Sequence, residues 1–138
     1  MSLQRFESCC AASRHACRVF LVDDDADTVE SLALLLGLDG HIVRTAISAP
    51  EALITLESFT PDVAFLDVNM PEIDGFTLAA QLRNRPALGH VKFVALTGDA
   101  SRADREAALA AGFDHHLAKP VDMRALSSIL ASAGRTLS

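Results

Sequence analysis

The sequence has no tryptophan, no tyrosine and no excess of basic side chains. Aspartate and glutamate together number 18, against 12 lysines and arginines, so the formal net charge is −6 at pH 7. Proteins that bind nucleic acid usually carry a basic patch, and those that bind single strands stack bases on aromatic side chains. We therefore expect no direct contact with nucleic acid.

Long hydrophobic runs are also missing. No apolar stretch approaches the roughly 20 residues that a helix needs to span a bilayer, and the first residues lack the unbroken apolar segment of a signal peptide. Half of the 138 residues are nevertheless hydrophobic, which is enough for one domain with a buried core. We expect a cytoplasmic domain that makes no membrane contact.

Cysteine is scarce, and the three cysteines, Cys9, Cys10 and Cys17, all precede the first predicted strand. Together with His15 they offer metal-binding atoms, but the Cys-x-x-Cys spacing typical of zinc sites is absent. We expect reduced thiols, and we interpret residues 1–17 as a flexible extension or linker without a role of its own.

Short apolar runs alternate with helical patterns along the rest of the chain, which is typical of βαβ units around a parallel sheet. Strands are predicted at 18–22, 41–46, 62–66 and 91–96, with a short fifth strand leading to Lys119. We predict an α/β fold with a doubly wound, five-stranded parallel sheet in the flavodoxin-like order 2-1-3-4-5. This domain spans residues 18–133, and 134–138 form a tail.

Helix signals lie between these strands. The first helical face is predicted to contain Val29, Leu32, Leu35 and Leu36, with Asp25 or Asp27 as the cap. The run from Ser48 to Glu51 is typical of a capping box with proline in the first turn. A helix is predicted from Ser101 to Gly112, and Asp122 is expected to cap the last helix.

Polar residues follow the apolar part of each of four strands. Asp23 and Asp24 follow the first strand, Asp67 the third and Thr97 the fourth, while Lys119 lies just past the fifth. Because parallel strands end at the same edge of a sheet, we expect these side chains to meet in one cleft. Each residue alone also has a plainer interpretation, as a helix cap, a turn residue or a surface lysine.

The predicted cleft suits a divalent cation and a phosphoryl group. Carboxylates are hard oxygen ligands that favour Mg²⁺ or Mn²⁺, and no histidine or cysteine accompanies them as a zinc site would require. Asp67, at the end of the central strand, is placed to attack phosphorus and form an aspartyl phosphate. Lys119 can offset charge on the phosphoryl oxygens, and Thr97 can donate a hydrogen bond to one of them.

Four segments in this order, LVDDD, FLDVNMPEIDG, VALTG and LAKP, resemble the receiver domain of two-component response regulators. The resemblance covers residues 18 to about 133. It implies that Asp67 accepts a phosphoryl group from a histidine kinase or a histidine phosphotransfer domain and then switches the surface offered to a partner. It also implies no substrate turnover beyond self-phosphorylation and autodephosphorylation.

The resemblance further implies roles for individual residues. Mg²⁺ would be bound by Asp23, Asp24, Asp67 and the backbone carbonyl of Asn69. Lys119 would bridge to the phosphoryl group or to Asp67, and Thr97 would move to meet the phosphate. In this family the peptide bond before the proline that matches Pro120 is commonly cis.

One position departs from the family pattern. The family usually has tyrosine or phenylalanine as a switch residue three places before the lysine, and here that place holds His116. Histidine is smaller and titrates near neutrality, so two interpretations stay open. His116 is either a switch residue that responds to Thr97 or a polar residue of an edge strand.

One segment also bears on the origin of the domain. The run GFDHHLAKPVD, with Val121 after Lys-Pro, looks like the receivers of hybrid sensor histidine kinases, and a stand-alone response regulator is the alternative. No output module is recognised after the last helix. We also expect a possible homodimer through the face formed by the fourth helix, fifth strand and fifth helix.

Three other classes match less well. Asp23 and Asp25 have the D-x-D spacing of aspartate-nucleophile phosphatases, but Asp27 stands where such enzymes carry threonine. A calcium loop would need glycine at Thr28 and glutamate at Leu34. A flavin-binding module would place a phosphate cradle after the first strand, where the carboxylates would repel it.

Overall fold

The computed structural model describes residues 17–68, 75–98, 106, 109–119 and 121–137. Its core is a parallel sheet of five strands in the order β2-β1-β3-β4-β5, which confirms the predicted strand order. The strands are β1 (Arg18–Val22), β2 (Ile42–Ala46), β3 (Val63–Asp67), β4 (Lys92–Thr97) and β5 (His115–Ala118). Strands β3 and β4 start and end one residue later than predicted, so that Asp67 and Thr97 belong to them.

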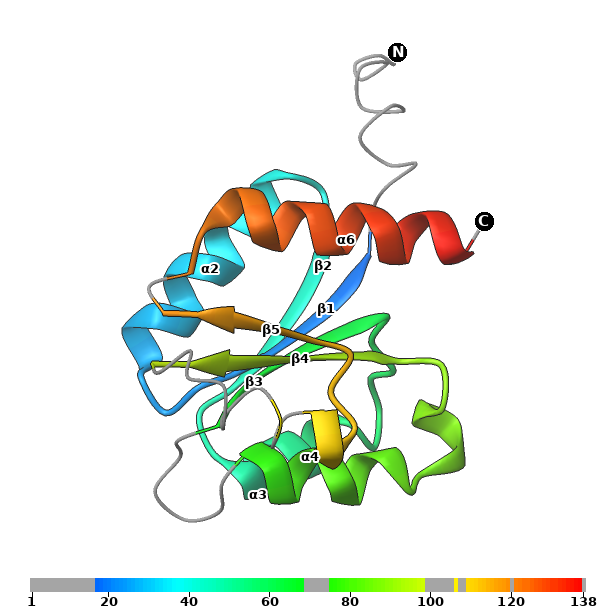
Figure 1. Cartoon of the computed structure of the whole chain (residues 1–138). Helices are drawn as coiled ribbons and strands as arrows, with labels where there is room; N and C mark the ends of the chain where they lie inside the picture. Colours follow the sequence, from blue (N-terminus) through cyan, green and yellow to red (C-terminus); the bar gives the residue numbers. More distant parts are fainter. Residues whose placement is uncertain (1–16, 69–74, 99–105, 107–108, 120, 138) are drawn as a thin grey trace.

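Helices cover both faces of this sheet (Figure 1). They are α2 (Ala26–Leu38), α3 (Ala49–Thr55), α4 (Gly75–Arg83) and α6 (Met123–Leu137), with a short 3₁₀ helix, η2, at Pro86–Leu88. Helices α2 and α6 lie on one face, and α3 and α4 lie on the other. Of the helix predicted between Ser101 and Gly112, residues 106 and 109–111 are described and are helical.

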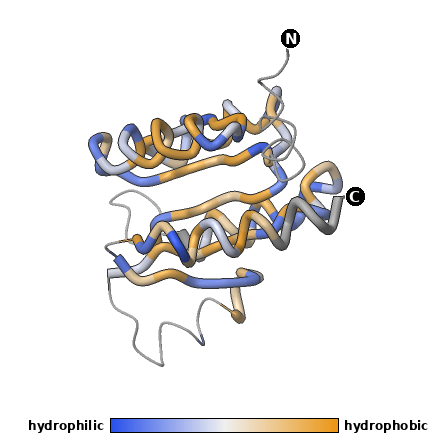
Figure 2. Tube along the Cα trace, turned by 90° about the horizontal axis from the view of Figure 1, so that it is seen from above, coloured by the Kyte–Doolittle hydropathy of each residue, from blue (hydrophilic) through white to orange (hydrophobic). Residues whose placement is uncertain are grey.

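Two hydrophobic clusters hold the helices to the sheet because strand side chains alternate between its faces. Phe20 of β1 packs in the cluster under α3 and α4, whereas its neighbour Leu21 packs in the cluster under α2 and α6. Figure 2, seen from above, shows hydrophobic residues along strands and helices alike. The central strand β3 is buried along its whole length. Such a strand tolerates polar residues only at its end, which is where Asp67 lies.

The helix caps follow the sequence signals. Asp25 is the N-cap of α2, and Asp122 accepts a hydrogen bond from the Arg124 N–H at the start of α6. In α3 the Glu51 N–H donates to Ser48 Oγ over 3.2 Å, as in a capping box. The Glu51 side chain reaches one residue further back than in the usual box, because its Oε1 accepts from the Ile47 N–H at 2.7 Å.

Three sequence predictions differ from the structure. Leu35 is 45% exposed, because the buried stripe of α2 is narrow and consists of Val29, Leu32 and Leu36. Cys17, which we assigned to the extension, is 2% exposed and its thiol donates to the Leu130 carbonyl, so it belongs to the folded unit. The predicted tail is helical as far as Leu137, because α6 extends to that residue.

Residues 1–16, with Cys9, Cys10 and His15, lie outside the described part of the chain. Within the described ranges, no helix combines the length and the apolar character needed to cross a membrane.

Candidate functional site

Three buried polar side chains gather at the carboxyl edge of the sheet. Asp23 follows β1 and is 1% exposed, Asp67 ends β3 and is 2% exposed, and Thr97 ends β4 and is 3% exposed. Among the described residues these are the only buried polar or charged side chains. Burying a carboxylate costs free energy unless a partner compensates it, so their concentration at one edge calls for a positive charge nearby.

Lys119 supplies that charge. Its Nζ lies 2.9 Å from Asp23 Oδ2 and 3.3 Å from Asp67 Oδ2. Its backbone N–H donates to the Thr97 carbonyl at 2.8 Å, which ties the segment after β5 to the end of β4. Burial works against the ammonium ion, but the two carboxylates outweigh it and raise the pKa of Lys119 above its ordinary value. Lys119 is therefore a cation at neutral pH.

The two oxygens of Asp23 have different environments. Oδ1 accepts a hydrogen bond from the Asp25 N–H at 3.0 Å. Oδ2 is buried and has no hydrogen-bond partner in the described structure, although the Lys119 ammonium lies within ion-pair distance of it. The contact with Lys119 is an ion pair, because charge attraction does not require hydrogen-bond alignment. This oxygen keeps lone pairs that a cation can use.

The cluster of Asp23, Asp24 and Asp67 fits a hard divalent cation. One carboxylate oxygen from each lies within 4.8 Å of those of the other two, with Asp24 on the exposed side. Three carboxylates this close repel one another, and Lys119 offsets only part of their charge. A small, oxygen-preferring ion such as Mg²⁺ matches these donors.

Comparison with known protein families decides the class. The family model of the response regulator receiver domain matches residues 19–131. The chain belongs to this receiver domain family.

Relatives of this receiver domain occur in chains of different length. An uncharacterised 14.6 kDa protein of Leptolyngbya boryana is 44% identical over 104 residues, which are 75% of this chain and 79% of that protein. The transcriptional regulatory protein PrrA of Mycobacterium leprae is 42% identical over 103 residues, 75% of this chain but only 43% of PrrA.

Solved structures have the same fold. The signal receiver domain of a signal transduction histidine kinase from Syntrophus aciditrophicus superimposes with a TM-score of 0.80 at 27% identity. The match covers 89% of this chain and 93% of that one.

Other residues singled out in the sequence are not members of the carboxylate cluster. His116 is half-buried in the edge strand β5, opposite Ala95 of β4. Asp25 caps α2, and neither Asp25 nor Asp27 is one of the three clustered carboxylates. Asn69 and Pro120 lie outside the described residues.

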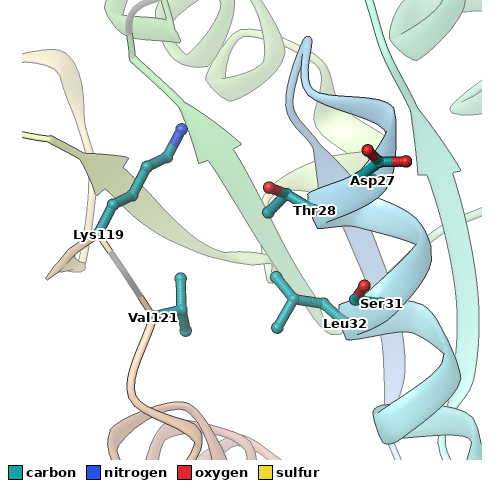
Figure 3. A pocket seen from close by; sticks show the side chains of 6 residues that line it. All are labelled: Asp27, Thr28, Ser31, Leu32, Lys119 and Val121. Atoms are coloured by element: carbon teal, nitrogen blue, oxygen red, sulfur yellow. The ribbon is translucent and has the colours of Figure 1, made fainter.

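A hollow beside Lys119 was not foreseen from the sequence. It has a volume of about 330 Å³ and lies between the first two turns of α2 and the segment after β5. Figure 3 shows its lining, which consists of Asp27, Thr28, Ser31, Leu32, Lys119 and Val121. The helical spacing of the α2 residues was visible in the sequence, but their position opposite Val121 depends on how α2 and α6 pack. This receiver domain therefore has an open space next to its buried acidic edge.

Proposed function

We propose that this receiver domain takes up a phosphoryl group on Asp67, in a reaction that depends on Mg²⁺ or Mn²⁺. The donor is a phosphohistidine of a histidine kinase or of a histidine phosphotransfer domain. The observation that carries the proposal is the contact of one ammonium group, on Lys119, with the two buried carboxylates of Asp23 and Asp67. Family membership supports it, because receivers are phosphoacceptors of two-component systems.

Asp67 is the nucleophile in this proposal. It is the last residue of the central strand, so the sheet fixes its backbone, and its side chain is buried at the sheet edge. An Asp67 oxygen forms the new P–O bond while the P–N bond of the phosphohistidine breaks, and the imidazole leaves. A carboxylate that is already in place lowers the barrier mainly through positioning.

Asp23, Asp24 and Asp67, with the backbone carbonyl of Asn69, would hold the cation. When bound, Mg²⁺ would neutralise charge on the phosphoryl oxygens and orient them for in-line attack. The residue chemistry supports this choice, because the three side chains offer only oxygen ligands, and Asp23 Oδ2 lacks a hydrogen bond.

Lys119 and Thr97 act on the transferred group. The Lys119 ammonium can pair with Asp67 before transfer and with a phosphoryl oxygen after it. The Thr97 hydroxyl can donate a hydrogen bond to a second phosphoryl oxygen. The Lys119 N–H donates a hydrogen bond to the Thr97 carbonyl. A displacement of Thr97 would therefore also displace the residue that follows β5. His116 lies three residues before Lys119 on that strand, and we propose it as the residue that passes the shift to a partner surface.

After transfer, the domain signals through its altered surface and slowly hydrolyses its own acyl phosphate. We propose no other turnover, a cytoplasmic location, and no contact with nucleic acid or membrane, in line with the net charge of −6. The same proposal includes a homodimer through the face formed by the helix predicted between Ser101 and Gly112, strand β5 and helix α6.

Two origins fit the chain. The likeness to the receiver of a Syntrophus histidine kinase and the valine at 121 favour a hybrid kinase. The 14.6 kDa relative, most of which this chain covers, favours a stand-alone regulator instead. We propose the hybrid kinase as the first choice.

The test is phosphorylation by a small donor. The protein is incubated with acetyl phosphate and Mg²⁺, and intact mass is recorded with and without a chelator. We expect one phosphoryl group per chain, lost with the chelator and in Asp67→Asn. The control Asp39→Asn, which changes an exposed aspartate at the end of α2, should be modified like the wild type. Equal modification of Asp67→Asn would overturn the proposal.

A further inference from the structure

Asp25 is adjacent to the carboxylate cluster but is not part of it. One of its carboxylate oxygens, Oδ1, accepts the Asp27 N–H at 3.1 Å, and the other, Oδ2, accepts the Thr28 hydroxyl at 2.8 Å. Both oxygens are therefore occupied within the first turn of α2. A carboxylate used in this way is a helix cap, and Asp25 is not among the three clustered carboxylates.

The backbone of Asp25 contacts the cluster as well. Its N–H donates to Asp23 Oδ1 at 3.0 Å. This bond sets the rotation of the Asp23 carboxylate, because one oxygen is held by the loop and the other then points to Lys119 Nζ at 2.9 Å. The place of the Asp25 N–H depends in turn on the extended conformation that the cap gives to Asp25, with φ −88° and ψ 101°.

Helix α2 anchors this arrangement in the core. Val29 is 2% exposed and Leu36 is fully buried in the cluster under α2 and α6. The Asp25 carbonyl accepts the N–H groups of Thr28 and Val29, so the cap is continuous with the anchored helix. Asp24 lies between the hydrogen-bonded Asp23 and the capping Asp25, and both of its neighbours are therefore held.

We propose that Asp25, with the Thr28 hydroxyl, is a positioning residue for the cation site. Asp25 acts through geometry. The cap fixes the position of the Asp25 N–H, this N–H orients the Asp23 carboxylate, and Asp24 is held between the two. Its negative charge is not what matters. This inference rests on the proposed function, since it concerns the same Mg²⁺ or Mn²⁺.

The test compares two variants of Asp25 by direct Mn²⁺ titration, followed by electron paramagnetic resonance of the free ion. Asp25→Ala removes the cap, and we expect the Mn²⁺ affinity to fall about tenfold, as is usual when a group supporting a metal ligand is lost. Asp25→Asn removes the charge but keeps a good capping group, and we expect an affinity within about twofold of the wild type. Thr28→Val, which deletes only the hydroxyl, should give a smaller loss than Asp25→Ala.

Ser48→Ala is the matched control, because it removes the cap of α3, a helix that carries none of the clustered carboxylates. Its melting temperature should fall as in Asp25→Ala, while its Mn²⁺ affinity stays that of the wild type. Thr28→Val serves in place of Asp25→Ala if the latter does not fold.

Two results would overturn the inference while leaving the proposed function intact. One is wild-type affinity in Asp25→Ala despite a lower melting temperature. The other is an equal loss in Asp25→Ala and Asp25→Asn, which would make the charge responsible. A wild-type protein that binds no Mn²⁺ would overturn the inference and the proposed function together.

Discussion

The Lys119 ammonium lies 2.9 Å from Oδ2 of Asp23, a carboxylate that is only 1% exposed. A buried carboxylate of this kind is stable only when a positive charge accompanies it. The oxygen that Lys119 contacts is also the oxygen of Asp23 that has no hydrogen bond. We therefore predict that Lys119 and a divalent cation share this acceptor, so that each can partly replace the other.

The first prediction concerns Lys119→Met. Without the ammonium, Asp23 and Asp67 lose their counter-charge, and we expect the free energy of unfolding to fall by about 2 kcal/mol in a chelator. This is less than the usual cost of breaking a fully buried ion pair, because Lys119 is 30% exposed. Added Mg²⁺ should raise the melting temperature of the variant more than that of the wild type.

The control is Lys92→Met, at the opposite end of β4, where the same chemical change leaves the cluster intact. Its response to Mg²⁺ should match the wild type. Equal Mg²⁺ effects in the wild type and Lys119→Met would show that the ammonium and the cation do not share Asp23.

The second prediction concerns pH and His41. The Cys17 N–H donates to His41 Nδ1 at 3.0 Å, which requires that nitrogen to be unprotonated. Burial lowers the pKa of His41, with Asp39 opposing it. The unfolded chain then binds more protons than the folded one, so this contribution to stability is complete above the unfolded pKa of about 6.5. It is lost as the pH falls below that value toward the folded pKa.

Urea unfolding of the wild type and His41→Gln, at about pH 5.5 and about pH 7.5, tests this sign. The wild type should lose more stability at the lower pH than His41→Gln does. His90→Gln, at an exposed position, should keep the wild-type pH dependence. A wild type that becomes more stable on acidification relative to His41→Gln would contradict the prediction.

The third prediction concerns Arg83, at the end of α4. Its guanidinium donates to the Gly112 carbonyl at 3.0 and 2.8 Å and to the Val91 carbonyl at 3.1 Å, and it pairs with Asp114 at 2.6 Å. It also lies 4.5 Å from the centre of the Phe93 ring. Lysine lacks the planar fork needed for these contacts, so Arg83→Lys should lower the free energy of unfolding by about 1–3 kcal/mol.

Chemical denaturation of Arg83→Lys measures this loss, with Arg85→Lys two residues further along as the control. We expect Arg85→Lys to lie within about 0.5 kcal/mol of the wild type. Equal, small effects in the two variants would mean that the Arg83 contacts add nothing to stability.

The fourth prediction concerns the reactivity of Cys17. Burial, with the charge of Asp62 nearby, raises the pKa of its thiol to about 11. Relative to the ordinary value of 9.0, this lowers the reactive thiolate at neutral pH by about a hundredfold. In a protein with Cys9 and Cys10 changed to serine, iodoacetamide should modify Cys17 slowly when folded and readily in urea. Rapid labelling of the folded protein would contradict the burial of this side chain.

The sequence was most informative where a local signal and a topological rule agree. Asp67 and Thr97 could be placed together because each ends an apolar run, and parallel strands end at one edge. Caps such as Ser48 could be recognised from their neighbours alone. These features depend on a few adjacent residues or on strand order, and both can be read from a pattern.

Other contacts join residues that no local pattern connects. Arg83 meets Gly112, and His41 meets the Cys17 N–H, only because separate segments pack against each other. The hollow beside Lys119 depends in the same way on the distance between α2 and α6. Leu35 was misplaced because the width of a buried helical stripe is set by the sheet beneath it, and the sequence shows only its period.

The most direct test of the central claim is to find which aspartate carries the phosphoryl group. The protein is treated with acetyl phosphate and Mg²⁺, reduced with borohydride, which converts an acyl phosphate to homoserine, and digested for peptide mass analysis. We predict homoserine at position 67 and at no other aspartate. Homoserine at position 23, as an aspartate-nucleophile phosphatase would give, or none at all in the presence of Mg²⁺, would contradict the account.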